Sequence, residues 1–156
     1  MKRVTLLSLS HLLVLVIGFA GGIYLLPILS APPAPSGEAV QQAAAGAQWT
    51  GEFRRDLADS DALHWGEGTL HVGRDAISLD GKIAPGPAYM LYLSREFVET
   101  EADFLRLKAG MANVGDVKTF DNFVVQVPPG IDPGDYTTAI VWCESFDQFI
   151  TAAQYR

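Results

Sequence analysis

One thiol is the side chain whose chemistry would matter most in this chain. The sequence holds a single cysteine, Cys143, which follows Trp142 and precedes Glu144. A reversible two-electron thiol–disulfide couple needs a second sulfur, so Cys143 would act only through a partner chain, a metal or a bound cofactor. Glu144 disfavours the thiolate because a neighbouring negative charge raises a thiol pKa. The structural alternative is that Cys143 packs as a small buried hydrophobic side chain, as unpaired cysteines often do.

The histidines are the other candidate ligands, and their spacing gives weak support for a metal site. His64 and His71 do not form a close-spaced pair such as HxH or HxxxH, which structural zinc sites usually contain. His71 is expected to face solvent from a strand. The acidic residues Asp56, Asp59 and Asp61 lack the glycine and distal glutamate of a calcium loop. We therefore predict no metal site and expect surface or hydrogen-bonded histidines.

The sequence contains none of the short motifs of the common cofactor enzymes. It has no CxxCH for covalent haem, no GxGxxG, no Walker loop and no GxSxG. Motifs thus identify no cofactor, and a hydrolase is the least favoured class. We lean towards a protein that is not an enzyme, and any activity is expected to be redox chemistry.

Composition and charge exclude several other classes. The chain of 156 residues is 49% hydrophobic and 19% charged, which excludes an intrinsically disordered protein. Its formal net charge is −7, and two of its eleven basic residues are Lys2 and Arg3 at the N-terminus. The remainder is more acidic still and would repel phosphate, so we expect no nucleic-acid partner.

A long apolar segment follows the N-terminus. Residues 4–29 contain only four scattered polar side chains, and as a helix they would span about 39 Å against a hydrocarbon core of about 30 Å. A cleavable signal peptide has a shorter apolar region of about 7–15 residues. Lys2 and Arg3 favour a cytoplasmic N-terminus. We predict that residues 1–30 are an uncleaved anchor in the inner membrane, contacting lipid through residues 4–29, with the rest in the periplasm.

Two features inside this segment have functional and ordinary interpretations. His11 is ionisable within the predicted span, which is a functional signal by default. The favoured interpretation is a neutral imidazole near the headgroups. Gly18 and Gly22 form a GxxxG spacing that would let two helices approach. Such a match often arises by chance, so dimerisation through these glycines is the less favoured alternative.

The rest of the chain divides into a linker and one domain. Residues 31–48 are rich in alanine and proline, carry little charge and contain no aromatic residue. Such a segment is expected to be a mobile, semi-extended tether that the fold does not need. Aromatic residues and turn signals begin together at Trp49, and residues 49–156 are long enough for one independent core.

Alternating apolar residues predict that the domain is mostly β-strand. The expected strands lie around residues 69–72, 77–79, 87–94, 123–127, 136–143 and 149–155, with turns at residues 73–75, 80–81 and 132–135. The run from Tyr136 to Cys143 has the most β-branched and aromatic residues and is predicted to be a central strand. One short helix is expected from Thr100 to Ala109, with Thr100 as its cap. The fold class is therefore all-β, a sandwich or barrel-like domain with one inserted helix after a transmembrane helix.

The C-terminal two thirds of the sequence resembles the DM13 domain. The hallmark of that family is a hydrophobic strand ending in Trp-Cys and followed by phenylalanines. The matching parts of this chain are Gly51-Glu52-Phe53, His64 with Gly68, Gly86-Pro87 before the Tyr89–Leu93 strand, Gly115–Phe120, and Ile140–Cys143 with Phe146 and Phe149. One position departs from the pattern, because the family commonly has Asp after Gly-Pro and this chain has Ala88.

The resemblance implies a β-rich extracytoplasmic module that takes part in electron transfer. In such a module the cysteine is the redox centre or a ligand to a prosthetic group, and haem enters only through this analogy. The candidate cofactor-binding residues are then Cys143, His64 and Trp142, with a redox or envelope protein as partner. The alternative is a non-catalytic cell-envelope binding module in which Cys143 and Trp142 are core residues.

Overall fold

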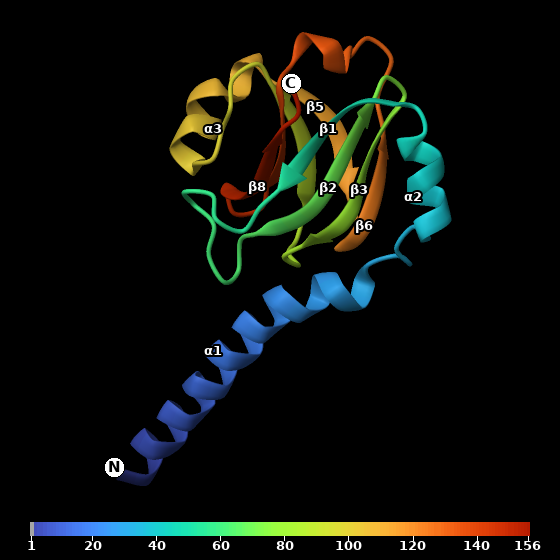
Figure 1. The fold of residues 1–156 in the computed structure, drawn as a ribbon. Helices are drawn as coiled ribbons and strands as arrows, with labels where there is room; N and C mark the ends of the chain where they lie inside the picture. The colour runs from blue at the N-terminus through green and yellow to red at the C-terminus, as the bar shows by residue number, and fades with distance from the viewer. Residues whose placement is uncertain (1) are drawn as a thin grey trace.

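A long N-terminal helix is followed by a β-sandwich in the computed structural model of the protein, which describes residues 2–156 (Figure 1). The elements in chain order are α1 (Lys2–Ser30), α2 (Gly37–Ala44), β1 (Ala47–Phe53), β2 (Gly66–Gly73), β3 (Ala76–Ile83), β4 (Tyr89–Ser94), α3 (Glu101–Leu107), the 3₁₀ turn η1 (Lys108–Gly110), β5 (Ala112–Val117), β6 (Asp121–Gln126), the 3₁₀ turn η2 (Pro133–Asp135), β7 (Thr138–Cys143) and β8 (Gln148–Gln154).

The strands form two antiparallel sheets of four. One has the order β1-β2-β3-β6 and the other β5-β4-β7-β8. The sheets approach each other at both sides, where β1 lies near β8 and β5 near β6. This arrangement confirms the predicted all-β sandwich with a short inserted helix.

The core lies between the sheets because apolar residues alternate along the strands. Leu70 and Leu79 are fully buried in the inter-sheet core together with Leu91 and Val141. Every residue of β7 is buried, and the strand lies between β4 and β8. The prediction of a central strand at residues 136–143 is therefore confirmed.

Three predictions of local structure were wrong or incomplete. The turn expected at Asp80-Gly81 is instead the middle of β3, where Gly81 pairs with Gly68 of β2. A Cβ at either glycine would collide with the backbone of the other strand, so the glycines permit close approach. Strands β1 and β5 were not predicted.

The segment before the sandwich also differs from the expected tether. Residues 37–44 form helix α2, which starts at the cap Ser36, whose hydroxyl accepts the Ala39 amide at 3.2 Å. This helix packs on β2, β3 and β6, and its only apolar large side chain, Val40, is 1% exposed. The expectation of a mobile tether is therefore wrong for residues 37–44, and only residues 31–36 separate α1 from the domain.

Helix α1 extends away from the sandwich (Figure 1). It is long and apolar enough to cross a membrane, and it also lies where a signal sequence would lie. Its C-terminal part reaches the end of the sandwich where β7 ends and β8 begins, because residues of both regions line the same cavity.

Candidate functional site

Strand β7 places its last two residues on opposite sides of the sheet. Cys143 belongs to the core between the sheets, whereas Trp142 belongs to a second cluster on the outer face. This follows from the two-residue period of a strand. Trp142 is therefore not beside Cys143 in a common site, and the two candidates must be described separately.

The Cys143 thiol is held by the backbone of the preceding β3–β4 loop. It is 2% exposed, and its Sγ donates to the carbonyl oxygen of Pro87 at 3.1 Å. The Glu144 amide donates to the carbonyl oxygen of Ala88 at 3.1 Å. Ala88 has a φ of 50°, in the left-handed region that a residue with a Cβ rarely adopts. The loop that contains Gly86-Pro87 thus meets the end of β7 through one side-chain-to-backbone and one backbone-to-backbone hydrogen bond.

The surroundings keep the thiol protonated. Burial raises the pKa of Cys143, the backbone amides of Phe146 and Ser145 lower it, and the charges of Glu144 and Asp147 raise it again. The net effect is a pKa above the ordinary value, as expected for a buried thiol beside carboxylates. The Tyr89 side chain shares this environment, and burial together with Cys143 raises its pKa as well.

A cavity of about 440 Å³ opens beside the thiol. Cys143 and His64, which are far apart in the sequence, both line it, and most of the remaining lining is apolar. The other contributors are the Pro85–Pro87 loop, Tyr89, Leu63, Phe146, Gln148, Ile150, and Ala20, Ile23 and Tyr24 of α1. The structure therefore brings two of the three candidate site residues to one cavity.

His64 is oriented by an acidic residue in its own loop. Its Nδ1 lies 3.0 Å from Asp61 Oδ2, and Asp61 Oδ1 accepts the backbone amides of Leu63 and His64. The hydrogen bond with His64 lowers the pKa of Asp61 and outweighs the opposite effect of burial. This pairing occupies one ring nitrogen and leaves Nε2 for another contact, an arrangement common to ligating histidines. His71 is half-buried on β2 and is not among the residues that line this cavity.

The outer face of β7 is a packed aromatic layer. Trp142 stacks on Phe104 of α3 with ring centroids 3.8 Å apart and planes at 9°, and Phe104 meets Tyr92 edge to face. The Nζ of Lys108 lies 5.6 Å from the Trp142 ring. Trp142 Nε1 is buried and has no hydrogen-bond partner among the described residues. Trp142 is therefore enclosed in this layer and does not line the Cys143 cavity.

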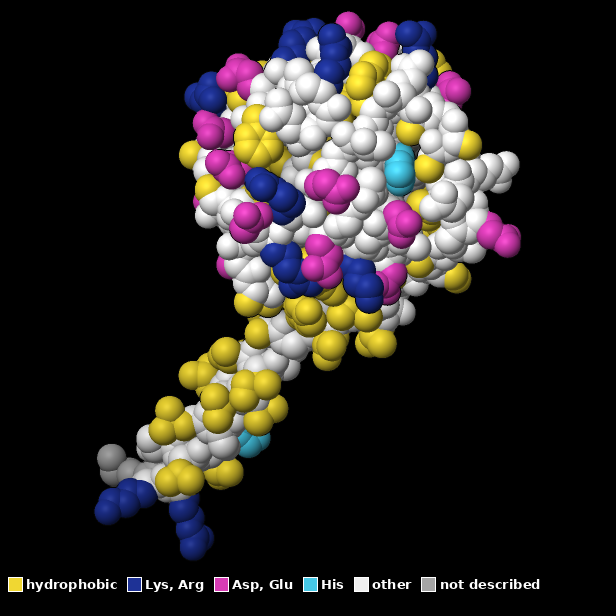
Figure 2. Space-filling view, in the orientation of Figure 1, with side chains coloured by type: hydrophobic (Ala, Val, Ile, Leu, Met, Phe, Trp, Pro, Cys, Tyr) yellow, Lys and Arg dark blue, Asp and Glu magenta, His cyan; other side chains and the backbone are white. Residues whose placement is uncertain are grey.

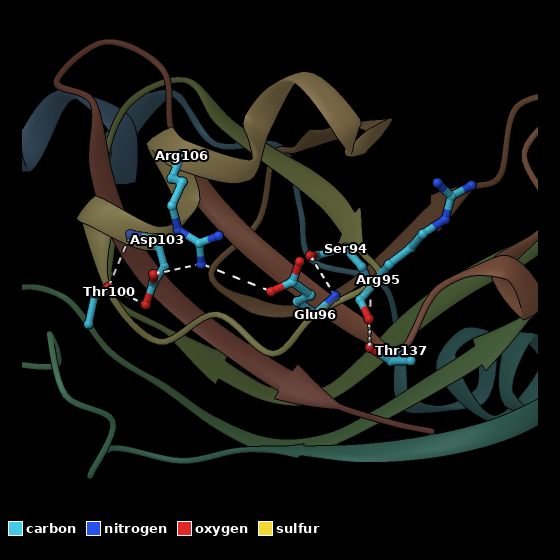
Figure 3. A network of polar contacts seen from close by, with 7 residues as sticks. All are labelled: Ser94, Arg95, Glu96, Thr100, Asp103, Arg106 and Thr137. Carbon is cyan, nitrogen blue, oxygen red and sulfur yellow. Dashed lines mark hydrogen bonds and ion pairs between the residues drawn. The ribbon is translucent and has the colours of Figure 1, made fainter.

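Helix α3 is capped at its own N-terminus, and one ion pair joins it to the loop after β4 (Figure 3). The Thr100 hydroxyl accepts the Asp103 amide at 3.2 Å and donates to Asp103 Oδ2 at 3.0 Å, which confirms the predicted cap. Arg106 bridges Asp103 at 2.9 Å and Glu96 at 4.0 Å. In the same network Thr137 donates to the carbonyl oxygen of Arg95, which ties the loop after β4 to the start of β7.

Glu144, the residue after β7, contacts both the loop beside Cys143 and the aromatic layer around Trp142. Its amide binds the β3–β4 loop, as described above, while its carboxylate accepts Lys108 Nζ at 2.8 Å and the Tyr92 hydroxyl. Burial raises the pKa of Glu144, but the hydrogen bonds from Lys108 and Tyr92 together keep it below its ordinary value. The carboxylate is thus ionised at neutral pH and is committed to the outer layer.

Other residues that the sequence did not identify contribute to the site. Asp61, which the sequence suggested only as part of an acidic loop unsuited to calcium, orients His64, and Pro87 and Phe146, known from the sequence only as parts of the family motifs, line the cavity. The Asp61-x-x-His64 spacing was the available signal for the oriented histidine. Within residues 2–156 no group of three His, Cys, Asp or Glu side chains is placed to hold a metal ion.

The fold and site define a class: a β-sandwich module with one buried thiol beside an apolar cavity, behind an N-terminal apolar helix. The sequence model of the family described as electron transfer DM13 matches residues 53–155. Because the match covers most of the chain, the protein belongs to the DM13 family. No curated protein and no solved structure matches the sequence.

Proposed function

We propose that this protein is a membrane-anchored DM13 electron-transfer module whose centre is the Cys143 cavity. One observation carries the proposal. A thiol and an imidazole from distant parts of the chain line one mostly apolar cavity of about 440 Å³, a size typical of small-molecule sites. The family description, electron transfer, supports the reaction type.

The donor set fits a prosthetic group better than a bare metal ion. A metal ion held by the protein alone needs three or four side chains, and the described residues place no such group together. Haem iron already has four ligands from its macrocycle and needs only one or two from the protein, for which Cys and His are suitable. The apolar lining suits the flat macrocycle, and the bound group would supply a one-electron couple.

The residues of the chain have distinct roles in this proposal. Cys143 would bind the group through Sγ after losing the proton that it now donates to Pro87, and its raised pKa makes binding dependent on pH. His64, oriented by Asp61, would supply the second ligand or a hydrogen bond. The one-electron couple of the bound group would need no second thiol, and a reduced and an oxidised envelope protein would be its electron donor and acceptor.

The spectrum of the full chain tests this proposal. We expect protein purified in detergent from haem-supplemented cells to show a haem band that shifts on reduction. Cys143→Ser and His64→Asn should weaken the band at least several-fold, whereas the control His71→Asn should retain it, since His71 lies outside the cavity. A folded wild type that is colourless and does not bind added haemin would contradict the proposal.

One observation favours the second candidate, a non-catalytic envelope binding module. The thiol is 2% exposed, hydrogen-bonded and protonated, as in a structural cysteine. In that case Cys143 of colourless protein should resist alkylation until the domain unfolds, and Cys143→Ser should change stability alone.

The location is part of the proposal. We propose that α1 is an uncleaved inner-membrane anchor, and its length and apolar composition support a membrane span. Lys2 and Arg3 favour a cytoplasmic N-terminus, which would leave the sandwich in the periplasm. Alkaline phosphatase fused after Arg156 should be active, and the mature chain should retain α1. An inactive fusion, or a mature chain that begins near Ala31, would contradict this topology.

A further inference from the structure

Two exposed apolar side chains lie at the mouth of the Cys143 cavity. Leu63, in the loop between β1 and β2, is 56% exposed, and Phe146, in the turn between β7 and β8, is 52% exposed. Hydrophobic side chains gather at the end of the domain where α1 reaches it (Figure 2). Single exposed apolar residues are ordinary, but these two share one end of the sandwich with an apolar helix.

The connection between α1 and the sandwich keeps this end close to the helix. Only the six residues 31–36 lie between Ser30 and α2, and α2 is fixed to the sheet through Val40. Six extended residues reach about 20 Å. The domain therefore cannot move far from the C-terminal end of α1.

The length of α1 indicates that the helix leaves the membrane at the level of the cavity. About 20 residues cross the hydrocarbon core, so a span that begins near Val4 emerges near residue 23. The helix residues that border the cavity are Ala20, Ile23 and Tyr24. Tyrosine is enriched at membrane–water interfaces, which agrees with this depth for Tyr24.

Charge at this end does not favour an electrostatic contact. The cations of this end are paired with carboxylates: Lys118 with Asp116, Lys82 with Asp121 and Arg55 with Glu67. Asp61 and Asp147 lie within two residues of Leu63 and Phe146 in the sequence. An anionic lipid surface would be repelled by these carboxylates. The attraction between this end of the domain and a bilayer would therefore come from burial of the apolar side chains, and a zwitterionic lipid is sufficient for it.

We propose that Leu63 and Phe146 dock the sandwich on the bilayer that holds α1, so that the Cys143 cavity opens at the lipid surface. This inference rests on the proposed anchoring by α1. The occupant of the apolar face is the lipid headgroup and upper acyl region of that bilayer. A partner that reaches the cavity must then approach within or along the membrane surface.

Lipid-quenching of single-site probes tests the contact. The full chain is reconstituted in phosphatidylcholine vesicles in a Cys143→Ala background, with a fluorophore on Phe146→Cys, Leu63→Cys or the control Phe97→Cys. Phe97 is also an exposed phenylalanine, at 40%, but it lines a surface with Ala152 and Gln154 towards the far end of β8. We expect acyl-chain nitroxide lipids to quench probes at 63 and 146 at least threefold more than at 97, with no dependence on salt.

A second measurement uses the unmodified chain, in case the Cys143→Ala background does not fold. Photoreactive lipids should label α1 and the peptides around Leu63 and Phe146, and should spare the peptide around Phe97. Equal quenching at 146 and 97, or labelling of α1 alone, would overturn the docking while leaving the anchor intact. Release of the chain from vesicles by alkaline carbonate would instead show that the anchor proposal has failed.

Discussion

The two sides of β7 differ in how well they obey the ordinary rules of packing. On the outer side, Trp142 is stacked, enclosed and covered by a capped helix. On the inner side, Cys143 adjoins an open cavity and a loop in which Ala88 has a φ of 50°. Departures from local rules gather at functional sites more often than elsewhere. This contrast is consistent with the proposal that function belongs to the cavity side, although the outer side has one departure of its own, the buried Trp142 Nε1 without a partner among the described residues.

The largest expected effect is on the outer side. Trp142→Ala removes a fully buried ring and its stack with Phe104, so we expect a loss of about 3–5 kcal/mol in the free energy of unfolding. Urea denaturation measures it, and Trp49→Ala, at a half-buried tryptophan, should cost less. A loss below about 1 kcal/mol for Trp142→Ala would show that the outer layer does not support the fold.

On the cavity side, Cys143→Ser should have a smaller effect on stability. A hydroxyl replaces a thiol that is 2% exposed, and we expect a loss of about 1–3 kcal/mol from incomplete polar satisfaction. Stability and the haem band are measured on the same preparation. If a folded Cys143→Ser protein retained every redox property of the wild type, the thiol would have no part in electron transfer.

Relief of the backbone at Ala88 should stabilise the protein. Glycine adopts a φ of 50° without the steric cost that a Cβ imposes, so Ala88→Gly should gain about 0.5–1 kcal/mol. The gain should appear in thermal unfolding, while Ala39→Gly, in helix α2, should lose stability. If Ala88→Gly left the free energy of unfolding unchanged or lowered it, the backbone at Ala88 would not be strained.

The smallest effect concerns Glu144, which joins the two sides. Glu144→Gln should lose less than about 1 kcal/mol at neutral pH, because the Lys108 pair is partly exposed. The pKa of Glu144 is lowered in the folded state, so its contribution is complete above the ordinary value of 4.5 and disappears as the pH falls through the lowered pKa. Unfolding curves of the two proteins should therefore converge in acid, and a constant difference would contradict this origin.

Most of the sandwich could be predicted because alternation is a local signal. Leu70 with Val72, and Ile77 with Leu79, mark strands that the structure confirms. Strand β5 could not be found in this way, because Gly115 and a register shift in its pairing with β4 interrupt the alternation. Helix α2 was missed because Val40 alone gives it an apolar face, although Ser36 and Glu38 were available as signals of a helix start.

The candidate site was predicted in its residues but not in its geometry. Cys143 and His64 could be identified as candidates from their residue types, but they are far apart in the sequence, so nothing indicated that they share a cavity. Their meeting depends on the loops between β1 and β2 and between β3 and β4 lying at the same end as the Cys143 end of β7. The opposite faces of Trp142 and Cys143 follow from strand alternation, which the sequence contained once β7 was predicted.

The alternation at the end of β7 also bears on how the molecule opens. Native proteins unfold locally in separate cooperative units. The seven-residue helix α3 is held to the rest of the domain by one buried ring, one exposed ion pair from Arg106 to Glu96 and two hydrogen bonds of Glu101. A fluctuation that lifts α3 exposes the Trp142 indole to collisional quenchers while the two sheets keep their hydrogen bonds and Cys143 stays covered. Amide exchange should accordingly be fast in α3 and slow in β7, so that adjacent residues of one strand report on different opening events.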